Sequence, residues 1–477
     1  MFFNSLHFAA FLPIVFLLYW FVFNKNKSWQ NSLLIIASYY FYACWDWRFL
    51  FLLVFSTLLD YFTGIMIEKN ETISKRRFWF WLSIIVNLGF LGVFKYYNFF
   101  ATSFTELING FGFQVNPLLI KVILPVGISF YTFHGLSYVI DIYYKRIKAE
   151  YNFIDYSLFV SYFPLLVAGP IERATHLLPQ VKVKREFSFE KAKEGVHQII
   201  WGLVKKVVIA DSCAMYANEV FNHQEDMNSL SLVLGAIYFA FQIYGDFSGY
   251  SDIALGTSKL FGIDLLKNFN FPYFSRDIAE FWRRWHISLS SWFRDYLYIP
   301  LGGSKGGKWM QVRNTFIIFL VSGFWHGANW TFIAWGLINA IYFLPLLLLN
   351  KNRSNLEDIN FRWNREGLQT ILHIVLTFSI TTFAWIFFRA KSISDALLYI
   401  KNMFTNLNFD VQYLGNERYS FELLPLVGVF IVFEWFHKYK TEPISGKYEN
   451  VKLLFCIMAI LALGVFSDYK EFIYFQF

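Results

Sequence analysis

Three of the nine histidines lie in apolar stretches, where an imidazole could do acid–base chemistry: His134 in ISFYTFHGLSYVID, His286 in EFWRRWHISLSSWFRD and His326 in VSGFWHGANWTF. Apolar residues surround His326, and Gly323 and Gly327 flank it, so that a backbone or a substrate can approach closely. An ionisable group at membrane depth is expensive and marks a functional candidate. A neutral histidine hydrogen-bonded between helices fits the same pattern.

The other two histidines have competing structural interpretations. Arg283 lies three residues before His286, on the same face of a helix, and the charges of Arg283 and Arg284 would lower the basicity of His286. The same residues fit an interfacial helix whose arginines touch lipid phosphate. His134 fits a core histidine whose ring is satisfied by hydrogen bonds.

A polar break interrupts the apolar run QIYGDFSGYSDIALG, where Asp246 and Asp252 enclose Ser248 and Tyr250. One hypothesis is that these side chains orient a substrate or support a histidine. The alternative is a hydrogen-bond cluster between helices. The sequence leaves both open.

Several known catalytic signatures are missing from the sequence. It contains neither the H-E-x-x-H zinc motif nor the G-x-S-x-G nucleophile turn. Residues 302–308, GGSKGGK, match part of a phosphate-binding loop, but Trp309 stands where Ser or Thr would bind magnesium. The three cysteines, Cys44, Cys213 and Cys456, have no zinc or disulfide spacing. We therefore expect no metal site.

The composition is that of a membrane protein. Of the 477 residues, 56% are hydrophobic, 22% aromatic and only 16% charged, whereas a soluble domain carries about 25% charged residues. The net charge of +8 comes mainly from short basic clusters between apolar runs, and no nucleic-acid-binding signature accompanies it. Such clusters are typical of cytoplasmic loops, and they could also steer an acidic donor or carrier.

The predicted fold class is all-α, a polytopic bundle of transmembrane helices. A span needs about 20 mostly apolar residues, and roughly ten to thirteen spans are expected here. One membrane-embedded domain covers 1–477, with the catalytic block at 246–336. The predicted spans are 6–23, 31–47, 49–67, 78–98, 118–143, 155–170, 195–215, 229–247, 313–325, 329–349, 367–388, 421–437 and 451–467.

Basic loops predict the orientation of the first five spans. The clusters after the first, third and fifth spans can all face the cytoplasm if the N-terminus lies outside. No cleavage site follows the first apolar run, which suggests an uncleaved first span. Two mixed stretches, 164–194 and 264–312, are too polar for plain spans, and we expect short interfacial or re-entrant helices there.

Five segments together resemble the membrane-bound O-acyltransferase (MBOAT) family, in particular its bacterial branch that acetylates alginate. The opening MFFNSLHFAAFLPIVFLLYW and the closing FIYFQF are similar too, so that the resemblance runs nearly end to end. The five segments are PVGISFYTFHGLSYVIDIY at 125–143, FPLLVAGPIER at 163–173, DFSGYSDIALG at 246–256, FWRRWHISLSSWFRDYLYIPLGG at 281–303 and SGFWHGANWTFIAWG at 322–336.

The resemblance implies that the essential histidine of the family is His326 and that its second histidine is His286. It also implies a ring of helices around a thin centre pierced by a tunnel. An acyl thioester, either acetyl-CoA or an acyl carrier protein, would reach the histidine from the cytoplasm as a substrate, with no bound cofactor. The acceptor, or a relay of the periplasmic SGNH type, would approach from the other side.

The resulting hypothesis is transfer of an acyl group, most simply acetyl, to hydroxyls of an exported polysaccharide such as alginate at the cell inner membrane. His326 would be the general base. The oxyanion would be held by Asn329, the Trp325 N–H or His286, and Arg283, Arg284 and Arg294 would attract donor phosphates. The alternatives are acyl transfer to peptidoglycan, cellulose or teichoic acid, and a non-enzymatic transporter or scaffold of an export complex.

Overall fold

The computed structural model describes residues 1–121, 123–167, 169–359, 361–408, 423–438, 440, 443–466 and 473. These residues form helices, joined by turns and loops, and contain no strand. The chain divides into two compact units. Unit 1 comprises residues 1–196 and 254–266, and unit 2 comprises 197–253 and 267–477. The predicted all-α fold is therefore confirmed for the described residues.

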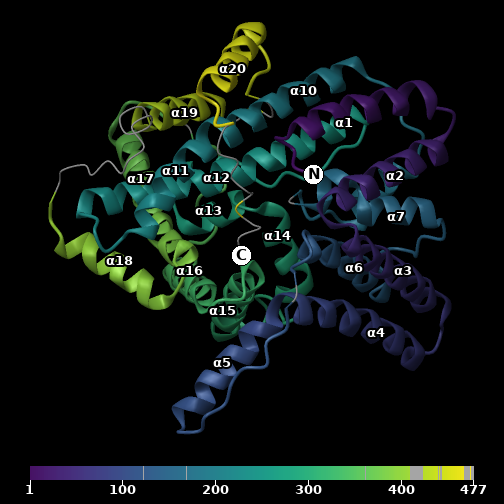
Figure 1. The fold of residues 1–477 in the computed structure, drawn as a ribbon, viewed down its shortest axis with the longest axis horizontal. Helices are drawn as coiled ribbons and strands as arrows, with labels where there is room; N and C mark the ends of the chain where they lie inside the picture. The colour runs from purple at the N-terminus through teal and green to yellow at the C-terminus, as the bar shows by residue number, and fades with distance from the viewer. Residues whose placement is uncertain are drawn as a thin grey trace. The chain divides into compact units, whose positions relative to one another are not determined.

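The helices of unit 1 come from the first part of the chain (Figure 1). They are α1 (Leu6–Leu17), η1 (Leu18–Val22), α2 (Lys27–Asp46), α3 (Arg48–Lys69), α4 (Ile73–Leu91), η2 (Gly92–Tyr96), α5 (Tyr97–Gly110), α6 (Ile128–Tyr143), α7 (Phe153–Ser161), α8 (Phe163–Leu166) and α9 (Ala174–Val181). Two helices, α10 (Phe189–Leu203) and α12 (Ser229–Leu260), carry residues of both units.

Unit 2 contains the remaining elements. They are η3 (Val204–Ala210), α11 (Asp211–Asn222), η4 (Pro272–Phe274), α13 (Ile278–Arg284), α14 (Ile287–Phe293), η5 (Arg294–Tyr298), α15 (Gly307–His326), α16 (Trp330–Leu348), α17 (Arg365–Arg389), α18 (Ile393–Thr405), α19 (Leu423–His437) and α20 (Glu449–Leu463). Of the η elements, η4 is a 3₁₀ turn and the others are π-helical.

Five helical stretches of the described chain are long and apolar enough to cross a membrane: Arg48–Lys69, Ile73–Gly110, Ser229–Leu260, Trp330–Leu348 and Arg365–Arg389. Leu6–Val22 and Leu423–His437 are apolar but shorter. Other predicted spans fall on shorter or more polar helices. Positions 122, 168, 421, 422 and 467 of the predicted spans lie outside the described residues, as does nearly all of the closing segment at 472–477.

Proline and glycine explain where predicted spans break up. The span expected at 118–143 becomes helical only at Ile128, after Pro125 and Gly127, whose φ of 72° is left-handed. The span expected at 155–170 divides into α7 and α8, and Pro164 lies in the first turn of α8. As expected, 264–306 contains only short helices, η4, α13, α14 and η5, whereas 307–312 begins the longer α15.

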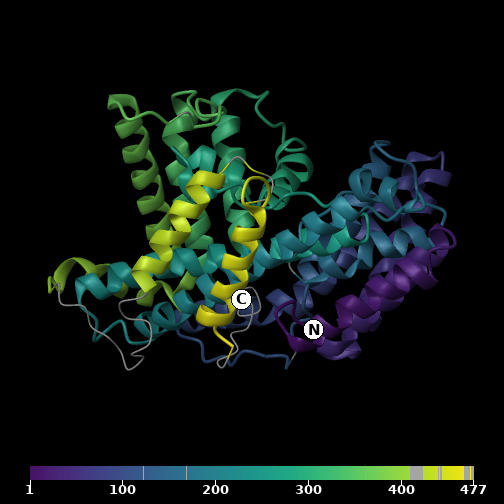
Figure 2. The ribbon, with the colours of Figure 1, turned by 90° about the horizontal axis from the view of Figure 1, so that it is seen from above.

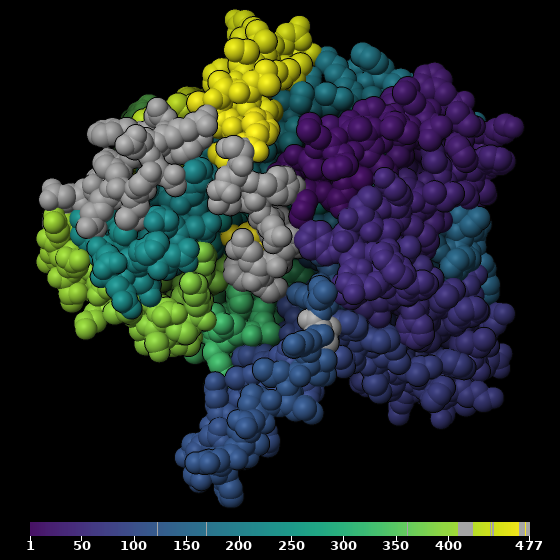
Figure 3. Space-filling view, in the orientation of Figure 1, coloured from purple at the N-terminus to yellow at the C-terminus, as the bar shows by residue number. Residues whose placement is uncertain are grey.

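In unit 1, α3, α4 and α6 lie side by side (Figure 1). The buried Asp60 on α3 accepts hydrogen bonds from Ser83 (2.6 Å) and Asn87 (2.8 Å) on α4. On α6, the buried His134 accepts the backbone N–H of Glu172 at Nε2 (3.1 Å), as predicted for a core histidine. By contrast, α5 buries only Thr105 and extends away from the rest of its unit (Figure 3).

Candidate active site

His326 is the last residue of α15, which packs against α16 in unit 2. A Cβ atom at Gly323 would lie 2.2 Å from the carbonyl oxygen of Phe332, and one at Gly336 would lie 2.3 Å from that of Phe319. Only glycine permits the two backbones to come so close. This contact holds the end of α15, and with it His326, against α16.

Aromatic rings surround the His326 side chain, which is only 4% exposed. The ring centroids of Trp325, Trp335 and Phe388 lie 5.0, 5.2 and 5.3 Å from that of His326. Trp335 comes from α16 and Phe388 from α17, so that three helices enclose the imidazole. The imidazole is therefore shielded from water by carbon-rich surroundings.

His286 lies beside His326, with the two ring centroids 6.4 Å apart. It is 1% exposed, and Phe247 on α12 meets its ring edge-on at 4.6 Å. Trp325 lies 5.8 Å from it. The structure thus brings together two histidines that lie 40 positions apart in the numbering. We refer to this group as the histidine cluster: His286, His326, Phe247, Trp325, Trp335 and Phe388.

The two predicted acids of α12 bind lysines of the π-helical segment η3. Asp246 pairs with Lys206 (2.8 Å), and its other carboxylate oxygen accepts the backbone N–H of Ile473 (2.7 Å). Asp252 pairs with Lys205 and accepts the side-chain amide of Gln198 (3.0 Å). These partners make both acids part of an interhelical polar network, which was the structural alternative for this stretch.

Ser248 and Tyr250, which lie between these acids, are both buried. Within the described part of the chain, the Ser248 hydroxyl has no hydrogen-bond partner. It remains available to a substrate or a water molecule. A substrate-orienting role for either residue stays a prediction.

All three predicted phosphate-binding arginines have protein partners. Arg283 donates to the backbone oxygens of Asn352 and Asn355, both at 2.8 Å. Arg284 binds the buried Glu280 at 2.7 Å. Both guanidinium groups therefore hold the α13 region in place. The side chain of Arg294 is 64% exposed and pairs with Asp295 (2.8 Å), so that it is the most accessible of the three.

Asn329 caps α16. Its side-chain oxygen accepts the N–H of Thr331 (3.0 Å), and its amide donates to the backbone oxygen of Lys391 (2.9 Å). These bonds make Asn329 an anchor for the start of α16, and a role for its second amide N–H at an oxyanion stays a prediction. Trp325 and His286 belong to the histidine cluster, and they are the better placed of the three predicted donors.

A separate polar cavity of about 290 Å³ is lined in part by residues that follow Phe388 in the sequence. Phe388 touches His326, and the next residue, Arg389, lines the cavity together with Lys391 and Asp395. Its other walls come from residues 221–226 at the end of α11. Charged and amide side chains of this kind are suited to a ligand rich in hydroxyl groups.

Sequence reasoning missed several of these residues for different reasons. Lys205 and Lys206 lie inside a predicted span, where two charges need partners, and this signal could have linked them to the acids of α12. Nothing local marks Trp335 or Phe388 as neighbours of His326, because the contact depends on how α15, α16 and α17 pack. Among the described residues, no group of three His, Cys, Asp or Glu could hold a metal ion.

Comparison with known proteins points to one family. The family model described as MBOAT, membrane-bound O-acyltransferase family, matches residues 143–388. A probable alginate O-acetylase of Pseudomonas aeruginosa is 38% identical over 92% of this chain and 82% of its own length. A peptidoglycan O-acetyltransferase of Helicobacter pylori is 36% identical over 86% and 81%. A teichoic acid D-alanyltransferase of Bacillus subtilis is 29% identical over 56% and 69%.

Proposed function

The chain belongs to the membrane-bound O-acyltransferase family and is a multi-pass membrane acyltransferase, and we propose that it acetylates hydroxyls of an exported polysaccharide such as alginate. The donor is a thioester on the cytoplasmic side, acetyl-CoA or an acyl carrier protein, and the membrane is the cell inner membrane. The observation that carries the proposal is the burial of His326 beside His286 within one aromatic cluster.

His326 is the general base. It takes the proton of an attacking hydroxyl while the oxygen adds to the thioester carbonyl. The tetrahedral intermediate then collapses, the carbon–sulfur bond breaks, and the proton passes from the imidazolium to the departing thiolate. No metal is needed, because a thioester is already activated. Trp325 and His286 are the candidate donors to the oxyanion, and the low-polarity cluster strengthens such bonds.

The polar cavity supports an acceptor rich in hydroxyls. Asp395 provides hydrogen-bond acceptors in this cavity, and Arg389 and Lys391 provide donors. In the sequence these residues follow Phe388, which contacts His326, by one to seven positions. On the donor side, exposed Arg294 and Lys305 attract phosphates or an acidic carrier. A relay protein of the periplasmic SGNH type would finish the transfer in cells where the acceptor itself does not reach the cluster.

The test replaces His326 with Ala and measures acetyl ester on the exported polymer by mass spectrometry. We expect ester to fall at least about a hundredfold, because general-base catalysis contributes on that scale. The matched control is His373→Ala, which removes an exposed histidine of the same unit. Wild-type ester in cells that contain stably inserted His326→Ala protein would remove His326 from the mechanism.

Peptidoglycan is a second candidate acceptor. The peptidoglycan O-acetyltransferase is 36% identical to this chain, close to the 38% of the alginate O-acetylase. The same chemistry would then modify cell-wall sugars. Mass spectra of the exopolymer and of purified peptidoglycan, from cells with and without this protein, distinguish the two. Ester lost only from peptidoglycan would replace alginate as the acceptor and leave the role of His326 unchanged.

A further inference from the structure

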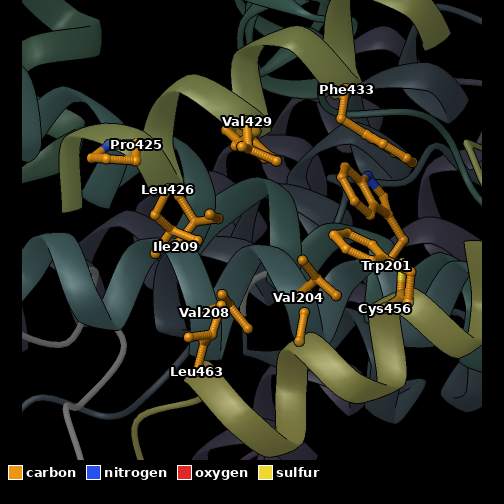
Figure 4. A pocket seen from close by; sticks show the side chains of 13 residues that line it. Trp201, Val204, Val208, Ile209, Pro425, Leu426, Val429, Phe433, Cys456 and Leu463 are labelled. Atoms are coloured by element: carbon orange, nitrogen blue, oxygen red, sulfur yellow. The ribbon is translucent and has the colours of Figure 1, made fainter. Parts of the chain in front are cut away.

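An apolar groove of about 630 Å³ lies in unit 2 between α10–η3, α19 and α20. Figure 4 shows Trp201, Val204 and Val208 on one side of it, Val429 and Phe433 on α19, and Cys456 and Leu463 on α20. Every residue that lines it is apolar apart from the Cys456 thiol and the Trp201 indole N–H. In Figures 1 and 2, α19 and α20 lie near one another.

Positive charge gathers at one end of this groove. Phe433, which lines the groove, stacks on His437 one turn later, with ring centroids 4.3 Å apart. Cys456, which also lines it, comes one turn after Lys452. Lys440 lies close enough to interact electrostatically with both His437 and Lys452. The groove therefore ends at a cationic rim made of Lys440 and Lys452, beside the ring of His437.

The lysines of this rim are not neutralised by ion pairs within the described part of the chain. There, neither Lys440 nor Lys452 lies within salt-bridge distance of a carboxylate, and Lys452 donates only two long bonds, of 3.2 Å each, to the backbone oxygens of Pro443 and Ser445. By sequence, 438–452 carries four lysines and two glutamates, a net charge of +2. Lysine ammonium groups at the end of an apolar groove are suited to bind an anionic group that is attached to a hydrocarbon chain.

We propose that the groove between η3, α19 and α20 binds an anionic phospholipid of the bilayer, with an acyl chain along the groove and the phosphate on the cationic rim. Basic pockets between membrane helices bind acidic lipid headgroups in this way. A basic loop can also serve orientation alone, but that role needs no groove beneath it. The site is independent of the proposed acyl transfer, since neither its rim nor its lining includes a residue of the histidine cluster.

The test titrates the purified full-length protein in detergent with phosphatidylglycerol or phosphatidylcholine and counts bound lipid by native mass spectrometry. We expect phosphatidylglycerol to bind more tightly. Near a charged lipid each lysine contributes on the order of a fivefold gain in affinity, so that Lys440→Gln with Lys452→Gln should weaken phosphatidylglycerol binding roughly 25-fold. Ala459→Trp, which fills the groove, should lower binding of that lipid while leaving both lysines in place.

The matched control is Lys351→Gln with Lys401→Gln, which removes the same charge from exposed positions elsewhere in unit 2. It should bind phosphatidylglycerol like the wild type. Equal affinity for both lipids, or an unchanged affinity in the rim variant, would overturn the proposal and leave the lysines a role in orientation only. A lipid-independent dimer mass abolished by Ala459→Trp would assign the groove to a second copy instead.

Discussion

His286 combines two unfavourable features at one position. Its backbone is left-handed, with φ 42° and ψ 56°, a conformation that residues with side chains rarely adopt. Its ring is buried, and in the described part of the chain neither ring nitrogen has a hydrogen-bond partner. A buried unsatisfied polar group costs about 1–3 kcal/mol. Such costs persist mainly where function requires them, and this supports a role for His286 in the reaction.

The substitution His286→Asn separates stability from activity. Asn tolerates the left-handed conformation better than most residues, and it removes the imidazole. We expect the solubilised protein to melt at the wild-type temperature or above, while ester formation falls at least about tenfold. Differential scanning fluorimetry and the ester assay measure the two effects. A fully active variant would show that His286 has only a structural role.

His176 in unit 1 predicts a pH effect on stability. Its Nδ1 lies 2.8 Å from Glu172, and this hydrogen bond raises the pKa of His176 above the ordinary value of 6.5. The folded chain therefore keeps a proton that the unfolded chain has lost. The stabilisation is complete below about pH 6.5 and disappears as the pH rises through the raised pKa. We expect the difference in Tm between wild type and His176→Gln to shrink over that interval.

At the scale of elements, the ion pairs between η3 and α12 could not be predicted from the sequence. Lys206 is 4% exposed and lies 2.8 Å from both Asp211 and Asp246. The sequence placed the acids in a polar break and left two alternatives open. It could not choose between them, because the π-helical turn that brings Lys205 and Lys206 to α12 has no recognised sequence pattern.

Lys206→Met should destabilise unit 2 by about 3–5 kcal/mol, because it leaves two buried carboxylates without their counter-ion. Thermal unfolding of the solubilised protein measures the loss. Combining the change with Asp246→Asn and Asp211→Asn removes the unpaired charges and should restore most of the stability. If the triple variant were as unstable as the single one, packing of the lysine stem rather than charge would be the cause.

The close approach of α15 and α16 gives a second prediction for an element. At Gly323 the added Cβ of Ala would meet the Phe332 backbone oxygen at 2.2 Å, so that the helices must separate and His326 must shift. We expect Gly323→Ala to cost about 1–3 kcal/mol and to lower ester formation. Gly428→Ala is the control, because nothing lies within 4 Å of the Cβ position on α19. Equal effects of the two changes would contradict the geometry.

Across the whole molecule, composition and continuous apolar runs predicted the all-α membrane fold, and the runs located several of the long helices to within a few residues. The prediction at 49–67 corresponds to α3 at Arg48–Lys69, and that at 367–388 to α17 at Arg365–Arg389. Hydropathy alone could not show that α7 and α8 are short, or that α10 continues through η3 into α11. Likewise, motifs identified His286 and His326, whereas the rings around them depend on packing between helices far apart in the sequence.

The net charge of +8 leads to a prediction for the intact enzyme. If basic loops steer an acidic acyl carrier protein, raising ionic strength shortens the screening length from about 10 Å at 0.1 M to about 3 Å at 1 M and slows encounter. We expect KM for the carrier to rise several-fold with salt while kcat stays constant. Initial rates in liposomes measure both constants. An unchanged KM would favour a donor recognised without long-range attraction.

The π-helical segment η3 makes unit 2 sensitive to chain length at one place. A π turn holds one residue more than an α turn. Deleting any single residue of 204–210 would remove this extra residue and let an ordinary α-helix form, so that the wide turn that directs both lysines toward α12 would be lost. Lys205 and Lys206 could then no longer reach Asp252 and Asp246 together. An in-frame deletion of one codon in this segment should lower the stability of unit 2 more than most single substitutions do. A one-codon insertion should be equally destabilising.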